Sequence, residues 1–436
     1  MTLYPNIRSR TLPRASTRGL LPALLCTMVL GGCVTQEVRI VDMRPPDQYQ
    51  GVQAEEVLLD IGVAVFDPNV PEDYDERIEQ IVQPEVRRAE ANYMPYFAKN
   101  MLQSTGNWGA VRVLPRPTDA VDVTVNGKIL HSDGESMELE VAVADATGKQ
   151  WFTRTYTALA SKYSYGDSMP PNVDPFQSIY KELANDMLEY RSAMSDAQIK
   201  AIRTVAEMKF ARSFAPDAFG NHVVASNDER FSVERLPAAD DPMLSRVRKI
   251  REREYLFIDT LDEYYDNFYR SMYTPYQNWR KATFDEAIKL KQLRAEARNR
   301  TIGGAMAIIG GVAAIYESDN AFVDASGVVS VMSGALTIKS AIGQRAEAAI
   351  SADILRELGT ATEAEVVPHT LELENRTVSL QGNVDEQYDE LRGILRRLYF
   401  EDLGLPVPPD VQAVEDAVNV VDVADSDNVA SESVTQ

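Results

Sequence analysis

The sequence has few of the residues that most often build metal centres and disulfide frameworks. Its 436 residues include two cysteines and three histidines, too few for a disulfide scaffold or a cysteine-rich zinc domain. Basic residues are also scarce: 44 Lys and Arg face 66 Asp and Glu, for a net charge of −22. Binding to a phosphate backbone needs a basic surface, so we expect no nucleic-acid partner. With 44% hydrophobic and 25% charged residues, the chain has a globular composition and room for two or three domains.

The remaining polar residues form no complete catalytic pattern. His131, His222 and His369 are scattered along the chain. Ser178–Lys181 matches S-x-x-K and Ser318–Asn320 matches S-D-N, two motifs of penicillin-binding enzymes. The third motif, K-T-G, is lacking, and patterns this short arise by chance. We therefore predict a protein that is not an enzyme, with no catalytic residue, no metal and no cofactor, and keep a peptidoglycan-acting hydrolase as an unfavoured alternative.

The N-terminus has the organisation of an export signal. Residues 1–19 contain four arginines and no acidic residue, and residues 20–30 are almost entirely apolar. The small residues Gly31 and Gly32 then precede Cys33. A basic region, a short apolar region and small residues before a cleavage site are typical of a signal peptide. The apolar run is too short to span a bilayer, which needs about 20 apolar residues.

Leu30-Gly31-Gly32-Cys33 resembles the lipobox of bacterial lipoproteins. The resemblance implies that residues 1–32 are removed as a lipoprotein signal peptide and that Cys33 carries diacylglycerol and further acyl chains such as palmitate. Val34 follows the cysteine, which in Gram-negative lipoproteins implies sorting to the outer membrane. We expect residues 33–54 to be the lipidated cysteine and a tether. The alternative is an ordinary signal peptide with a chance cysteine.

Residues 55–165 predict an α+β domain. An apolar strand at 57–66 is followed by a helix over 74–103, whose main segment begins at Pro84. A short strand at 110–114 and three alternating strands follow, the last two joined by a turn at Asp145–Gly148. The order β-α-β-β-β-β indicates an α/β sandwich with an antiparallel meander. The order and the apolar first strand faintly resemble the periplasmic α/β domains of envelope secretion and transport lipoproteins, but no functional residue can be transferred.

The rest of the chain is predicted to be mainly helical. Residues 174–300 contain helices, the last of them long and broken at Pro275, with a loop over 215–242. We expect residues 301–343 to form a glycine-rich helical hairpin in which small residues allow close packing. We expect residues 364–400 to form a ββα unit whose helix is capped by Asn383, and residues 404–436 to be a disordered acidic tail.

An aromatic stretch in the long helix is the candidate partner-binding site. Residues 246–300 carry 13 Lys and Arg against 9 Asp and Glu, so this region is basic within an acidic chain. Tyr and Trp often anchor interfaces, although the same residues could instead form a helix–helix core. The candidate residues are Tyr264, Tyr265, Phe268, Tyr269, Tyr273, Tyr276 and Trp279.

These features together predict a lipid-anchored envelope lipoprotein on the periplasmic face of the outer membrane. We expect it to bind the membrane through its lipid and an envelope protein through its folded region, as a component of an assembly, transport or cell-wall machine. An oligomer is possible. A pore or secretion channel that uses the hairpin at 301–343 is the second hypothesis, although that hairpin is short for a bilayer span and contains Asp324 and Lys339.

Overall fold

The computed structural model describes most of the chain between Asp42 and Asn299 and several segments beyond it. The described residues are 42–299, apart from 52–53, 81, 167–168, 171–172, 227, 229 and 239, together with 352–361, 369–373, 376–380, 383–408 and 420–421. The predicted signal peptide, Cys33, the hairpin at 301–343 and most of the acidic tail lie outside them.

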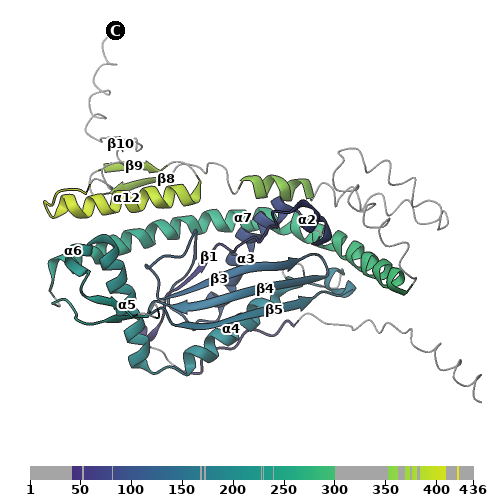
Figure 1. The fold of residues 1–436 in the computed structure, drawn as a ribbon, viewed down its shortest axis with the longest axis horizontal. Coiled ribbons are helices and arrows are strands. Elements are labelled where there is room, and N and C mark those ends of the chain that lie inside the picture. The colour runs from purple at the N-terminus through teal and green to yellow at the C-terminus, as the bar shows by residue number, and fades with distance from the viewer. Residues whose placement is uncertain are drawn as a thin grey trace, which may run out of the picture. The chain divides into compact units, whose positions relative to one another are not determined.

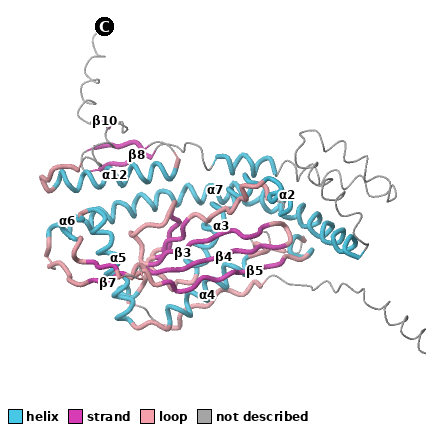
Figure 2. Tube along the Cα trace, in the orientation of Figure 1, coloured by secondary structure: helices cyan, strands magenta, loops and turns pink. Residues whose placement is uncertain are grey.

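The first half of the described chain is built around a five-stranded mixed sheet (Figures 1 and 2). The chain is of the α+β class, as the sequence predicts. Its elements are the short helix η1 (Glu55–Val57), β1 (Ile61–Ala64), α2 (Tyr74–Gln80), α3 (Pro84–Ser104), β2 (Val111–Leu114), β3 (Val123–Ser132), β4 (Ser136–Asp145), β5 (Gln150–Leu159) and η2 (Lys162–Tyr165). The strand order is β2-β1-β3-β4-β5.

Hydrophobic patterning explains this sheet. Strand β1 is apolar along its length and buried on both faces, as expected for a strand between parallel neighbours, and it pairs in parallel with β2 and β3. Strands β3, β4 and β5 form the predicted antiparallel meander. In β3 and β4, buried side chains alternate with half-exposed ones, so one sheet face packs against α3 and the other faces outward (Figure 1). Gly148 adopts φ 77° in the predicted β4–β5 turn, a conformation that favours glycine.

Helices follow the sheet and share its hydrophobic core. They are α4 (Gln177–Ser192), α5 (Asp196–Phe214), α6 (Pro216–Phe219) and α7 (Pro242–Asn299), with a small hairpin of β6 (Val223–Ala225) and β7 (Phe231–Val233) between α6 and α7. Helix α5 begins after Ser195, whose side chain forms a capping box with Gln198. The N-terminal part of α7 packs with α5, α6 and β2, and its later part joins the core formed by the sheet, α3 and α4.

The predicted break at Pro275 is wrong, because α7 runs through this residue. A proline inside a helix removes one backbone hydrogen bond and costs about 3 kcal/mol. Met272 and Tyr276, on either side of it, are both fully buried. Burial of a large apolar side chain contributes about 1.5–3 kcal/mol, so the packing of the two neighbours is sufficient to offset the proline.

The C-terminal ββα unit is present as predicted. It consists of β8 (His369–Leu373), β9 (Arg376–Leu380) and α12 (Val384–Asp402), and Leu371 pairs with Val378. Asn383 and Glu386 form the predicted capping box. Helix α12 packs on α7, as Figure 1 shows. In the predicted acidic tail, β10 (Val420–Val421) pairs with β9.

Candidate functional site

The aromatic residues of α7 contribute mostly to the core. Tyr265, Phe268, Tyr276 and Trp279 are at most 7% exposed, whereas Tyr264, Tyr269 and Tyr273 are partly buried. The ring of Tyr93 in α3 stacks on Tyr269 at 4.8 Å and meets Tyr276 edge-on at 5.1 Å. The helix-core alternative therefore accounts for the four buried residues. For the three partly buried ones, partner binding stays a prediction.

A buried polar network lies beside these rings. The Arg280 guanidinium donates to Asp174 Oδ2 at 2.8 Å and to the hydroxyl of Tyr276 at 2.7 Å. That hydroxyl donates to Glu90 Oε1 at 2.5 Å, and Glu90 forms an ion pair with Arg87 at 3.1 Å. The network thus contains two arginines and two carboxylates, all at most 3% exposed, so its formal charges cancel. Buried pairs of this kind are costly to break, and this one fixes how α7 packs against α3.

The other candidate residues are not brought together. His131 contacts Asp133 at 3.0 Å, and His222 Nδ1 lies 2.6 Å from the carbonyl oxygen of Arg235. The Lys181 ammonium of the S-x-x-K match forms an ion pair with Asp42 at 2.7 Å, while Ser318–Asn320 lies outside the described residues. Among the residues that the structure describes, no group of three or more His, Cys, Asp or Glu is arranged to hold a metal ion.

The clearest site is the segment by which the chain enters the fold, and we call residues 42–60 and the side chains that hold them the N-terminal junction. Asp42 begins it: its carboxylate accepts from Lys181 at 2.7 Å, and its carbonyl oxygen accepts from Gln177 Nε2 at 2.8 Å. Asn185 Oδ1 accepts from the amide of Asp47 at 2.8 Å. Gln177, Lys181 and Asn185 are four residues apart, so they form one row along α4. The segment therefore runs along this helix.

Two further side chains extend the contact: Asn107, outside α4, and Arg191, near the C-terminal end of α4. Asn107 is 1% exposed; its Oδ1 accepts from the amide of Tyr49 at 2.8 Å and its Nδ2 donates to the carbonyl of Asp47 at 3.1 Å. The Arg191 guanidinium lies 5.6 Å from the centre of the Tyr49 ring. The hydrogen bonds from Arg44 and Lys181 hold the pKa of Asp42 well below its usual range, so this carboxylate is charged at neutral pH.

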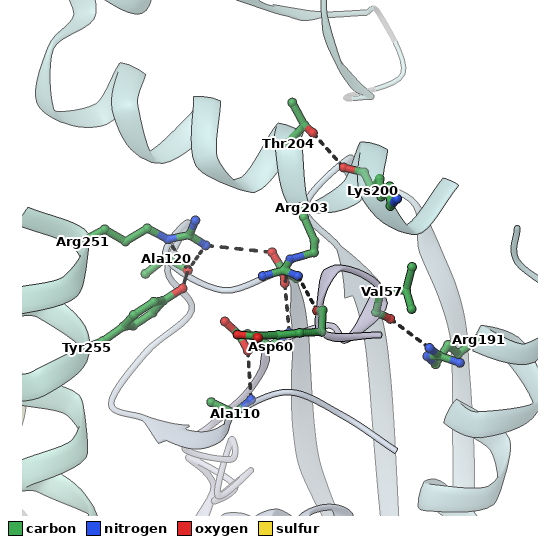
Figure 3. A network of polar contacts seen from close by, with 12 residues as sticks. Val57, Asp60, Ala110, Ala120, Arg191, Lys200, Arg203, Thr204, Arg251 and Tyr255 are labelled. Atoms are coloured by element: carbon green, nitrogen blue, oxygen red, sulfur yellow. Dashed lines mark hydrogen bonds and ion pairs between the residues drawn. The ribbon is translucent and has the colours of Figure 1, made fainter. Parts of the chain in front are cut away.

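Arginines from two helices hold the next part of the junction (Figure 3). Arg191 at the end of α4 donates to the carbonyl oxygen of Val57 at 2.9 Å, and Arg203 of α5 donates to that of Glu55 at 2.8 Å. Both carbonyls belong to η1. That of Glu55 also accepts from the amide of Leu58 at 3.1 Å, whereas that of Val57, at the C-terminal end of the turn, needs an external donor. Burial lowers the pKa of Arg191.

An aspartate pair ends the junction where the parallel strands begin. Asp60 precedes β1 and Asp122 precedes β3. Asp60 Oδ1 accepts from the amide of Ala110 at 2.9 Å, and Asp122 Oδ2 accepts from the amide of Asp60 at 2.9 Å. Arg203 and Arg251 approach Asp122 to 3.8 and 3.9 Å. The two carboxylates therefore connect the first strands of the sheet to α5 and α7.

Asp122 is the buried carboxyl of the N-terminal junction whose pKa is most clearly shifted toward neutral pH. It is 2% exposed, and burial raises its pKa to about 6, although the Asp60 amide, Arg251 and Arg203 favour the charged form. The Arg251 guanidinium and the Tyr255 hydroxyl both donate to the carbonyl oxygen of Ala120, as Figure 3 shows. These groups already hydrogen-bond or pair with one another, so the arrangement fastens the entry segment to the fold.

Sequence reasoning missed the junction. A signal was present, because Asp60 and Asp122 each stand immediately before or within a run of apolar strand residues, and a buried carboxylate needs donors. The identity of those donors was not visible, since Arg203 and Arg251 are far from both aspartates in the chain.

The fold and junction define an α+β protein whose N-terminal segment is fastened along a helix. Comparisons with protein-family models, curated proteins and solved structures found no match. In the part of the chain that the structure describes, no helix is both long and apolar enough to cross a membrane.

Proposed function

We propose that this protein is a non-enzymatic lipoprotein, anchored through Cys33 on the periplasmic face of the outer membrane, that acts as a binding or assembly component of a cell-envelope machine. The observation that carries the proposal is Leu30-Gly31-Gly32-Cys33 after a basic and then an apolar segment. Two or more acyl chains would give a stable anchor, whereas one binds only marginally.

The N-terminal junction is the part of the fold that supports the proposal. Asp42 lies nine residues after Cys33 and is already held by Lys181 and Gln177. Lipid attachment at Cys33 would thus act on a segment that is fastened to α4 rather than on a long free linker. A membrane-bound partner would then meet the folded region at a raised effective concentration.

Metabolic labelling of the full chain with an alkyne analogue of palmitate tests the anchor. We expect the wild-type chain to be labelled and recovered with outer membranes, and Cys33→Ser to lose both label and membrane association. Cys26→Ser is the matched control, because the other cysteine lies in the predicted signal peptide, and it should keep both. Label that persists in Cys33→Ser would refute the proposed anchor.

Crosslinking in intact envelopes followed by affinity isolation tests the binding role. With a tag placed after residue 436 so that Cys33 stays free, we expect a stable envelope protein partner in the wild-type sample. Isolation of the chain without any partner would contradict the binding role and leave the anchor result unaffected.

A further inference from the structure

Strand β5 is the last strand on its side of the sheet. The amide of Ala160, just after it, donates to the carbonyl of Glu135 at 2.7 Å. Antiparallel pairs alternate between bonded and non-bonded positions, and the register pairs Ala158 with Met137 and Tyr156 with Leu139. The β5 residues between these bonded positions therefore direct their backbone N–H and C=O groups away from β4, toward the open edge of the sheet. They are Thr153, Thr155, Thr157 and Leu159.

From Phe152 to Leu159 this edge has few of the devices that usually block strand addition, because its one β-bulge lies at the start of the strand, at Trp151. Strand β5 is ten residues long and contains no proline and no lysine, both of which commonly protect edges. Its one charged residue, Arg154, is held by Asp186 of α4 at 2.6 Å. Among the described residues, no strand pairs with this side of β5. The backbone groups are thus available for an added strand.

The outward sheet face beside the edge is acidic. Glu140 of β4 lies opposite Thr155 and Glu138 opposite Thr157, and both glutamates are half-exposed. Threonine is short, so long side chains on an added strand, about 10 Å from β4, could reach across it. Lys128 of β3 lies opposite Glu140 on its other side and is itself 3.8 Å from Asp67.

The helical side of the edge is also acidic. Helix α4 lies beside β5 (Figure 1), and Asp186 accepts from the Tyr156 hydroxyl at 2.7 Å. Glu182 and Glu189, four residues before and three after Asp186, share its helix face and are exposed. Arg154 faces these acids, and Lys181, which acts on Glu182, is itself paired with Asp42 at 2.7 Å. Lys149 lies over the Tyr190 ring at 5.2 Å. Negative charge therefore prevails on both sides of the edge.

We infer that the outer edge of β5 binds an extended segment of a partner protein that carries lysine or arginine, by adding a strand to the sheet. Backbone hydrogen bonds to Thr153, Thr155, Thr157 and Leu159 supply the pairing, and the flanking acids select basic side chains. A second copy of this chain would bring the same acidic rows toward each other, so charge favours a basic partner. The inference deepens the proposed binding role and rests on it.

Fluorescence anisotropy with the detergent-purified full chain tests this inference. The probes are labelled nine-residue peptides of alternating valine and threonine, with lysine or with glutamate at three positions. We expect the lysine peptide to bind at least about tenfold more tightly than the glutamate peptide, and its affinity to fall as salt rises. Equal binding of the two peptides, or no binding of the lysine peptide, would overturn the inference.

Two substitutions locate the binding site. Thr155→Pro removes one outward amide and should weaken the lysine peptide about tenfold, whereas Thr155→Val keeps the amide and should not. Glu140→Gln should also weaken binding, but Glu252→Gln on the exposed surface of α7 should not. Circular dichroism checks that each variant is folded. Unchanged peptide binding by a folded Thr155→Pro variant would refute the basic-peptide assignment. So would a wild-type protein that is a dimer through this edge, shown by conversion to a monomer in Thr155→Pro. Palmitate labelling is independent of these results.

Discussion

Replacement of the buried carboxyl at the N-terminal junction should change how stability depends on pH. Asp122 is 2% exposed and has a pKa of about 6, against 3.8 for an exposed aspartate. A carboxyl whose pKa is raised by folding contributes stability below its unfolded pKa and loses it as pH rises through the folded pKa. A shift of about two units corresponds to roughly 3 kcal/mol. The wild-type protein should lose most of this amount, about 2.5 kcal/mol, from Asp122 between pH 4 and pH 7.5.

Asp122→Asn removes the titration and keeps an oxygen that can accept from the Asp60 amide. The free energy of unfolding of this variant, relative to wild type, should therefore rise by about 2.5 kcal/mol from pH 4 to pH 7.5. Urea unfolding at a series of pH values, followed by the fluorescence of the three tryptophans, measures it. Asp119→Asn is the control: this half-exposed carboxylate pairs with Lys209 at 2.8 Å, and its loss should cost less than about 1 kcal/mol throughout. A pH-independent difference between Asp122→Asn and wild type would refute the reasoning.

Two further variants test the core and the C-terminal unit by the same unfolding assay. Arg280→Ala should lower the free energy of unfolding by about 3–5 kcal/mol, because Asp174 would be left as an unpaired buried charge; the double variant Arg280→Met with Asp174→Leu should recover much of it, and no recovery would contradict an electrostatic origin. Asn383→Ala should cost about 1 kcal/mol through loss of the helix cap, whereas an equal loss in Asn383→Ser, which keeps a capping oxygen, would argue against capping.

Local sequence signals predicted the elements well where the signal lies within a few residues. The alternation in β3 and β4, the Asp145–Gly148 turn and the cap at Asn383 each depend on neighbours in the chain, and each appears as expected. The prediction failed at Pro275, where burial of the adjacent turns outweighs the intrinsic cost of proline.

Long-range arrangements were not accessible from one sequence. The sequence predicted the element order but not the insertion of β1 between β2 and β3, which depends on parallel pairing across many residues. The N-terminal junction is a stronger example of a long-range arrangement: Lys181 contacts Asp42 across 139 positions, and nothing in the sequence around either residue relates it to the other. The aromatic stretch was visible as a pattern, but only tertiary packing distinguishes Tyr276 in the core from a partner contact.

Because Asp42 is held on α4, it would limit how far the folded region could move from a lipid anchor at Cys33. Nine residue steps from Cys33 to Asp42 span at most about 30 Å, and confinement to a hemisphere of that radius corresponds to a local concentration of roughly 30 mM. If residues 34–54 were all free, the reach would be about 75 Å and the concentration roughly fifteenfold lower. The contacts of Gln177, Lys181 and Asn185 would thus set the distance from the membrane within which the protein could meet a partner.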